Sequence, residues 1–309
     1  MMQGPTLSIV IPTFGREAVL VSTVRQLLAL SDGADEIVLV DQTATHEAST
    51  SKALQHWVET GKIRWIRQAE PSITRAMNTG LQAAFGDVVL FLDDDIVPTE
   101  QLVNVHRSAA SDRCISAGRV LQPWHAGRDF AADTHFHFAC VRPQTVTEFM
   151  GGNFSITRQA AIKLGGFDEN FVRVAYRFEA DFAKRWLASG GTIRYEPDAM
   201  IHHLKADSGG SRSFAHHVTT VRPDHAVGEN YIELKHRGLL GATPKMAKRL
   251  LRSVATGHHL RHPWYLPLTI AAEIRGMAWA TRLWRQGPRY VFDGDGQLPD
   301  ATKRLVNRP

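Results

Sequence analysis

Short apolar runs alternate with segments of helical periodicity along the first hundred residues. The apolar runs are typical of buried strands, at residues 7–11, 37–40, 63–66 and 88–92. The segments between them predict helices over residues 17–30, 46–60 and 72–84, the last with Ser72 as its N-cap. Near-continuous apolar strands separated by helices predict an α/β fold, with a mostly parallel, Rossmann-like sheet covered by helices on both faces.

The middle third of the chain is less regular. Strands are predicted at residues 115–121 and, with alternating polarity, at 134–141. A helix is predicted over residues 176–188, with three aromatic side chains at helical spacing: Phe178, Phe182 and Trp186. The glycine-rich stretch at 151–153 is too flexible for the centre of a sheet.

The pattern changes again near residue 226, where basic and apolar residues mix at helical spacing. We therefore expect one domain over residues 1–225 and a basic, largely helical extension over 226–309. The net charge of +5 belongs to this extension, because the chain from Tyr231 onward holds 14 Lys and Arg against 5 Asp and Glu. The overall charge is therefore no evidence for a polyanionic substrate.

Composition and length bound the class of protein. With 43% apolar and 22% charged residues, the 309-residue chain is an ordinary globular protein and not a low-complexity or disordered one. Its two cysteines are expected to be free thiols rather than a disulfide. Neither a signal-peptide pattern nor an apolar run of about 20 residues is evident, so we expect a cytoplasmic protein, with peripheral attachment to the inner face of the plasma membrane as an alternative.

Polar side chains follow the predicted strands where each one ends. Thr13 and Asp41 follow the first and second strands, and the run Asp93, Asp94 and Asp95 follows the fourth. Ligands bind parallel sheets beyond the carboxyl ends of the strands, so these side chains should meet at one edge. Adjacent carboxylates repel one another without a cation, and hard oxygen ligands favour Mg²⁺ or Mn²⁺. A solvated acidic turn is the alternative reading.

Several segments in this order resemble a family 2 glycosyltransferase with the GT-A fold. They are SIVIPTFGR at 8–16, EIVLVDQT at 36–43, residues 67–81, DVVLFLDDDIVP at 87–98 and GGFDENF at 165–171. The resemblance covers roughly residues 7–213. It implies an enzyme that moves a sugar from a nucleotide-diphosphate donor, most often a UDP-sugar, to a hydroxyl acceptor with inversion. Synthesis of a cell-surface glycan is the expected role, with a glycan or lipid-linked acceptor.

The resemblance assigns roles to the residues around the donor. The carboxylate run resembles the DxD motif, with Asp93 and Asp95 as metal ligands and Asp94 toward the ribose or a neighbouring side chain. His203 resembles a late histidine that some members use as a third ligand, and a structural role is its alternative. An imidazole ligand suits Mn²⁺ better than Mg²⁺. The other nucleotide-binding residues implied are Pro12, Thr13, Asp41, Arg75 and Asn78.

The general base is less clearly marked. The family's base is the Asp of a Glu-Asp pair about two turns before an arginine. Aligning on Arg185 puts Glu179 at the base position and Phe178 where the family has Glu. Asp181 is the second candidate and Asp168 the third, although Asp168 more often supports the acceptor loop. A carboxylate near a helix N-terminus also has a purely structural explanation.

The remaining assignments concern the acceptor and the leaving group. Gly151, Gly152 and Asn153 resemble the segment beneath the acceptor, with a plain β-bulge as the alternative. Arg212 lies in the loop DSGGSRS and could neutralise the departing diphosphate.

Other functions fit the sequence less well. Processive synthases of the family carry Gln-x-x-Arg-Trp, whereas this chain has Phe182 in place of the glutamine. A nucleic-acid or membrane-surface binding protein with a vestigial nucleotide-sugar fold is the second hypothesis, but it leaves the three aspartates without a purpose. No nucleic-acid partner is therefore expected. The extension is expected to pack as a helical cap, to form a homodimer contact, or to lie on an anionic membrane.

Overall fold

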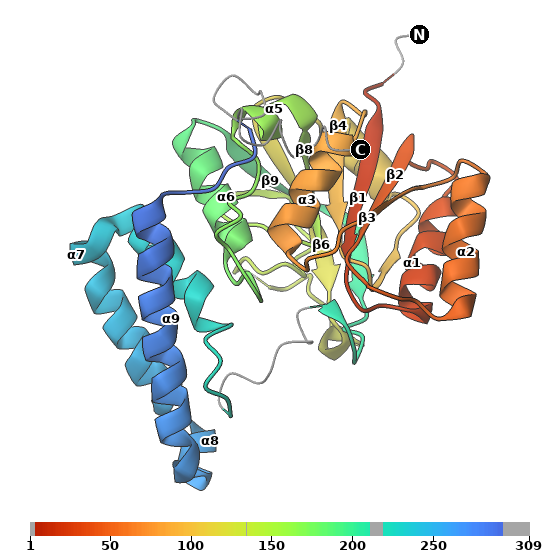
Figure 1. The fold of residues 1–309 in the computed structure, drawn as a ribbon. Helices are drawn as coiled ribbons and strands as arrows, with labels where there is room; N and C mark the ends of the chain where they lie inside the picture. The colour runs from red at the N-terminus through yellow and green to blue at the C-terminus, as the bar shows by residue number, and fades with distance from the viewer. Residues whose placement is uncertain (1–3, 134, 211–218, 293–309) are drawn as a thin grey trace.

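The structure is a computed structural model that describes residues 4–133, 135–210 and 219–292 of the chain. Its strands form one nine-stranded sheet (Figure 1). They are β1 (Leu7–Thr13), β2 (Glu36–Asp41), β3 (Arg64–Arg67), β4 (Val88–Leu92), β5 (Ile96–Pro98), β6 (Cys114–Leu121), β7 (Gln144–Val146), β8 (Asn153–Thr157) and β9 (Thr192–His203). The helices are α1 (Ala18–Leu28), α2 (Ala48–Glu59), α3 (Ile73–Ala83), α4 (Leu102–Ser108), α5 (Arg158–Lys163), α6 (Phe178–Ala188), α7 (Ala226–Val254), α8 (Gly257–Arg261) and α9 (Leu266–Gln286).

The first four strands lie in the order β3-β2-β1-β4 and run parallel. The sheet continues as β8-β6-β9-β5, in which β8 runs antiparallel to both of its neighbours. The predicted mostly parallel α/β sheet is therefore confirmed. Its topology brings the carboxyl ends of β1, β2 and β4 to the same edge, as the strand-end argument requires.

The sheet divides the core into two layers, because successive side chains of a strand face opposite sides. In β1, Leu7, Ile9 and Ile11 belong to the layer beneath α1, α2 and α4. Val10 belongs to the other layer, with side chains of α3, α6 and α7. Helix α3 lies very close to the sheet at Gly80, where an added Cβ would stand 2.2 Å from Cγ1 of Val10.

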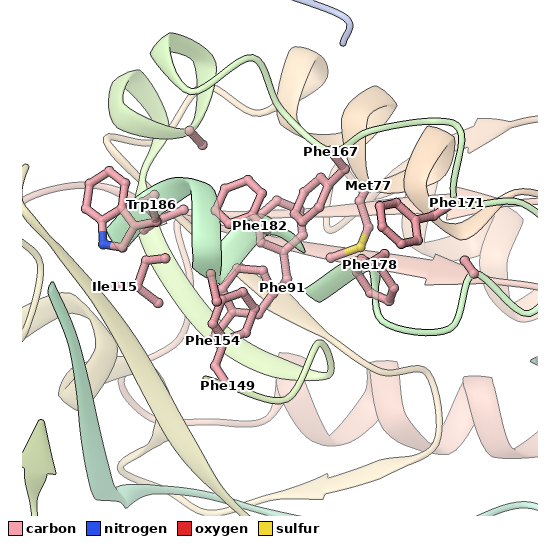
Figure 2. Close-up of a cluster of buried hydrophobic side chains, with 14 of the residues drawn as sticks. Met77, Phe91, Ile115, Phe149, Phe154, Phe167, Phe171, Phe178, Phe182 and Trp186 are labelled. Carbon is pink, nitrogen blue, oxygen red and sulfur yellow. The ribbon is translucent and has the colours of Figure 1, made fainter. Parts of the chain in front are cut away.

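An aromatic cluster fills the second layer beneath α6 (Figure 2). Phe182 stacks on Phe167 with ring centroids 4.6 Å apart, and Phe91 of β4 stacks on Phe154 of β8 at 5.0 Å. The expected stack of Phe178, Phe182 and Trp186 is buried on this face of α6. This packing fixes α6, and with it the acidic residues in its first turn.

The extension begins on the same layer. Helix α7 starts at Ala226, and its first turns bury Val227, Tyr231 and Leu234 among side chains of the sheet domain. At Gly238, with φ of 65°, the helix bends, and its outer half runs beside α9 away from the sheet (Figure 1). The extension is thus a cap whose inner end is part of the main core.

Two local predictions are wrong. The described residues of the expected strand at 134–141 form an irregular loop with bends and a turn, and the short strand β7 begins only at Gln144. Asn153 starts β8, which lies near the centre of the sheet between β4 and β6. The flexible glycines precede this strand rather than interrupt it. Both cysteines are free thiols, as expected.

Candidate active site

A pocket opens at the carboxyl ends of β1, β2 and β4. The described residues that line it come from the ends of strands and from the loops that follow them. They are Pro12, Thr13, Phe14, Arg16, Gln42, Pro71, Ser72, Ile73, Asp93, Asp94, Asp95, Arg173, Val174, His203 and Gly210. The structure therefore brings together six of the residues expected from the sequence: Pro12, Thr13, Asp93, Asp94, Asp95 and His203.

Three of these side chains form a cluster suited to a divalent cation. One potential ligand atom from each of Asp93, Asp95 and His203 lies within 4.8 Å of the others. Nε2 of His203 is 3.1 Å from Oδ1 of Asp95 and 3.8 Å from Oδ2 of Asp93. The antiparallel pairing of β5 with β9 produces this arrangement, because it places His203 opposite Ile96, directly after the carboxylates.

The electrostatics of the cluster favour a bound cation. Burial raises the pKa of Asp93, and the neighbouring charge of Asp95 adds to the shift, although His203 opposes it. Burial lowers the pKa of His203, but Asp95 and Asp93 outweigh it and leave that pKa raised. Two carboxylates and one imidazole are a donor set that fits Mn²⁺.

Gly152 makes room for one of the carboxylates. A Cβ added to this glycine would stand 2.0 Å from Oδ2 of Asp93, far inside van der Waals contact. A Cβ on Gly151 would stand 2.8 Å from Cζ of Phe178. The two glycines thus let the loop before β8 approach the acidic cluster and the start of α6 closely.

Arg16 neutralises the other side of the acidic run. Its Nε lies 3.1 Å from Oδ1 of Asp94, and one terminal nitrogen lies 3.2 Å from Oδ2 of Asp95. It also donates to the carbonyl oxygens of Ala206 and Ser208, so it connects β1 to the segment after β9. Sequence reasoning did not single out Arg16, although it ends the IPTFGR segment.

The carboxylate of Asp94 is hydrogen-bonded to side chains at the end of β1 and just after it. The hydroxyl of Thr13 donates to its Oδ2 at 2.7 Å, and Arg16 donates to its Oδ1. Burial raises the pKa of Asp94 to about 6, although Arg16 and Thr13 oppose the shift. Asp94 therefore holds the ends of β1 and β4 together, in line with the alternative of a bond to a neighbouring side chain.

Asp41, expected to bind the base, is completely buried at the end of β2. Its Oδ2 lies 2.8 Å from Nε2 of His46 and accepts from Trp65 and Arg67, and its Oδ1 accepts from the amide of Thr43. With four donors around it, the carboxylate has little capacity left for a ligand. Its neighbour Gln42 lies in the pocket instead.

Arg75 and Asn78 project from α3 toward the loop at 165–171 rather than into the described pocket. Nδ2 of Asn78 donates to the carbonyl of Phe167 at 2.9 Å, and its Oδ1 accepts from the amide of the same residue. Arg75 pairs with Glu70 at 2.8 Å. Ser72 caps α3 as expected, accepting from the amide of Arg75, and it also lines the pocket.

Glu179 lies in the first turn of α6, near the acidic cluster. Its pKa is raised, first by burial and further by the charges of Asp93 and Glu148, while Arg177 opposes the shift. A half-buried carboxylate with a raised pKa near the acidic cluster has the property of a general base.

The other two candidate bases are held in a buried ion network. The carboxylate of Asp181 lies 2.8 Å from Nζ of Lys235 and 2.9 Å from both Nε2 of His236 and Nε of Arg185. Asp168 pairs with the same Lys235 at 2.7 Å and accepts from the hydroxyl of Tyr231. Burial raises the pKa of Asp181, but His236, Arg185 and Lys235 outweigh it and leave that pKa far below its ordinary value.

Asn153, expected beneath the acceptor, also bonds inside the core. Its Nδ2 donates to the carbonyls of Arg119 and Ala199, and its Oδ1 lies 3.0 Å from Nε2 of His106. Burial lowers the pKa of His106 to about 4, so this imidazole is neutral and donates to Asn153. Arg212 lies outside the described residues.

Fold and site together define a GT-A-type α/β protein. Residues 8–179, more than half of the chain, match the family described as Glycosyl transferase family 2. The chain therefore belongs to glycosyl transferase family 2.

Two known proteins show how distant the similarity is. A pre-mycofactocin glycosyltransferase of Mycobacterium tuberculosis is 27% identical over 139 residues, which cover 41% of this chain and 29% of the relative. The match thus spans less than a third of that protein. The mannosyltransferase PcManGT from Pyrobaculum calidifontis, solved in complex with GDP-Man and Mn²⁺, superposes with a TM-score of 0.51 at 18% identity. That likeness covers 93% of this chain and 80% of the other, and it concerns the fold.

Proposed function

We propose that this protein is an inverting, metal-dependent glycosyltransferase that moves a sugar from a nucleoside-diphosphate donor to a hydroxyl acceptor. The observation that carries the proposal is the cluster of Asp93, Asp95 and His203 in a pocket that also contains Pro12, Thr13 and Gln42. A nucleotide sugar combines a diphosphate, which needs a cation, with a nucleoside, which needs a surface at the strand ends.

Asp93, Asp95 and His203 would hold the cation, with Mn²⁺ favoured by the imidazole. A divalent cation supplies neutralising charge to a departing diphosphate. Arg16 is already engaged with Asp94 and Asp95 and keeps the acidic run in place. The neighbour's complex with GDP-Man and Mn²⁺ is consistent with this chemistry.

Glu179 is the proposed general base. It takes the proton of the acceptor hydroxyl, whose oxygen attacks the anomeric carbon on the side opposite the diphosphate. The alternatives are weaker chemically, because Asp181 is paired with Lys235 and Arg185, and Asp168 is held by Lys235 and Tyr231. A carboxylate stabilised in this way is a poor proton acceptor.

The donor and acceptor are proposed more coarsely. A UDP-sugar is the first choice for the donor. A GDP-sugar is the second choice, because the carboxylate of Asp41 is already hydrogen-bonded within the protein and cannot select uracil by itself. A glycan or a lipid-linked sugar of the cell surface is the proposed acceptor. Cytoplasmic location with peripheral membrane contact fits such an acceptor, and among the described helices none has the length and apolar character needed to cross a bilayer.

Thermal denaturation with nucleoside diphosphates tests the function. UDP, GDP and dTDP are compared with and without Mn²⁺, and a ligand present at about 100 times its Kd adds about 2.7 kcal/mol to stability. We expect one diphosphate to raise the melting temperature in a Mn²⁺-dependent manner. The competing hypothesis, a nucleic-acid or membrane-surface binding protein, predicts no shift with any of the three. A screen of the matching nucleotide sugars for hydrolysis then identifies the donor.

A further inference from the structure

A second hollow adjoins the donor pocket where the sheet domain meets the extension. It has a volume of about 680 Å³, within the range of ligand sites. Phe14, Pro71 and Arg173 line both it and the donor pocket, so the two are contiguous. The other described residues around it are Arg222, Pro223, Asp224, Arg275, Ala278 and Trp279.

The hollow carries an excess of positive charge. Three arginines, Arg173, Arg222 and Arg275, line it against a single acid, Asp224. Asp224 is largely buried and faces Arg173, with 3.8 Å between its Oδ1 and Nε of the arginine. Among the residues that the structure describes, the side chains of Arg222 and Arg275 have no recorded ion pair or hydrogen bond, and both are exposed.

Apolar surfaces surround these arginines. The guanidinium carbon of Arg173 lies 5.9 Å from the ring centroid of Trp279 on α9, and Phe14, Pro71 and Pro223 complete the walls. Guanidinium groups bind phosphates and carboxylates in a bidentate manner, and an aromatic wall offers area to the rest of a ligand. The site therefore fits a molecule with an anionic group and an apolar or ring-shaped body.

An anionic group bound in the hollow would be distinct from the diphosphate of the donor. The acidic cluster at Asp93 and Asp95 calls for a cation that would neutralise that diphosphate, and none of its residues lines the hollow. Arg173 belongs to the loop that leads into α6 and Glu179, the proposed base. A ligand in the hollow could therefore be bound together with the donor and beside it.

We propose that the hollow binds the acceptor through a phosphate or carboxylate group, so that the enzyme glycosylates an anionic acceptor. This inference rests on the proposed function, because it supplies the second substrate of that transfer. The anionic group belongs either to a soluble molecule or to a lipid headgroup, and the chemistry of recognition is the same.

Binding measurements on the full chain test the proposal. Glucose 6-phosphate and glucose are the soluble probes. Short-chain phosphatidylglycerol and phosphatidylcholine, both below their critical micelle concentrations so that no membrane surface is present, are the lipid probes. We expect one charged probe to bind at least about tenfold more tightly than its neutral counterpart, because hydrogen bonds between guanidinium groups and an anion are stronger than those to a neutral hydroxyl. The pair of probes that shows this preference identifies the source of the anion.

Variants test whether the arginines of the hollow cause the tighter binding of the charged probe. Arg222→Gln with Arg275→Gln should abolish it, whereas Arg282→Gln should keep it, because Arg282 is an exposed arginine of the same helix α9 outside the hollow. No charge preference in either pair of probes would overturn the proposal. An equal loss of this preference in Arg282→Gln would also overturn it. The same holds if the double variant loses as much affinity for the donor nucleotide as for the charged probe, because the arginines would then bind the donor.

The same samples separate this inference from the proposed function. Binding of a nucleoside diphosphate with Mn²⁺ is measured in parallel. If no nucleotide binds, the proposed function fails. If a nucleotide binds and no probe shows a charge preference, only the anionic acceptor is rejected.

Discussion

Glu179 differs from the neighbouring acids in the direction of its pKa. Burial and the charges of Asp93 and Glu148 raise this pKa, so the ionised form that acts as base is disfavoured at low pH. We expect kcat/KM to rise with increasing pH, and the apparent pKa of this rise should lie above 4.5, the ordinary pKa of glutamate. A pH–rate profile with the identified donor measures this apparent pKa. An apparent pKa at or below the ordinary value would mean that a residue other than Glu179 is the base.

Replacing Glu179 separates catalysis from folding. Glu179→Gln removes the proton acceptor, and turnover should fall by about 10²–10⁴. Because the folded state raises this pKa, the charge on Glu179 opposes folding at neutral pH, so the variant should melt at a higher temperature than the parent. Asp181→Asn is the contrasting variant, since loss of its ion pairs should lower the melting temperature. Full turnover in Glu179→Gln would transfer the role to another acid.

Gly152 tests the metal site without changing a ligand. Its added Cβ would stand 2.0 Å from Oδ2 of Asp93, so Gly152→Ala should turn that carboxylate out of its position. Displacement of this one ligand should weaken Mn²⁺ binding by about tenfold or more, while the melting temperature of the metal-free protein changes little. Gly257→Ala is the control, because no atom lies within 4 Å of its added Cβ. Unchanged Mn²⁺ affinity in Gly152→Ala would mean that Asp93 is not a ligand.

The sequence predicted the residues at the strand ends well and those in long-range bonds poorly. Thr13 and Asp93 to Asp95 were identifiable because the sheet itself places them in the pocket. Asp41 and Asn153 also lie at strand ends, but partners distant in sequence, such as Trp65 and His106, occupy their side chains. No local pattern reveals such partners, and the same holds for Arg16 and Gln42.

At the scale of elements, alternating apolar strands and helices were sufficient to predict the parallel half of the sheet. Strands β1, β2 and β4 have near-continuous apolar runs, which few other structures accommodate. The antiparallel half was harder, since β8 follows two glycines and β7 has only three residues. Its position depends on pairing between segments far apart in the chain.

The ion network between α6 and α7 gives a prediction about these elements. Lys235 of α7 bridges Asp168 and Asp181, and burial opposes its charge, but the two carboxylates outweigh this and raise its pKa. Lys235→Met leaves two buried carboxylates without their shared cation, which should cost about 3–5 kcal/mol. Denaturant unfolding measures the loss, with Lys248→Met, exposed on the same helix, as the control.

The network also makes stability depend on acidity. The pKa of Asp181 is lowered in the folded state, so its contribution to stability is present above its ordinary value of 3.8 and is lost as pH falls through the lower folded value. In Lys235→Met this acid-dependent contribution should shrink. An equal loss of stability in Lys248→Met, or none in Lys235→Met, would show that α7 is not held to α6 by these charges.

At the scale of the whole molecule, the extension has two ends of different character. Its inner end lies in the core of the sheet domain, whereas its outer end exposes Leu251, Leu260 and Trp264 around α8. Figure 1 shows α8 at the end of the helical pair farthest from the sheet. Residues 239–272 include five Lys and Arg and no Asp or Glu. We propose that this outer end lies on an anionic membrane surface.

Such a surface should bind vesicles through both charge and apolar insertion. The full chain should sediment with vesicles that contain phosphatidylglycerol and much less with phosphatidylcholine alone, because each lysine or arginine near the surface contributes about 1 kcal/mol. Leu260→Asp should release it, since Leu260 is 87% exposed and its replacement disturbs no packing. Val58→Asp, an exposed apolar position on α2 in the sheet domain, is the control. Equal sedimentation of the two variants would contradict the membrane contact. The exposed apolar residues would then form an interface between two copies of the chain, and the mass measured in solution would detect such a dimer.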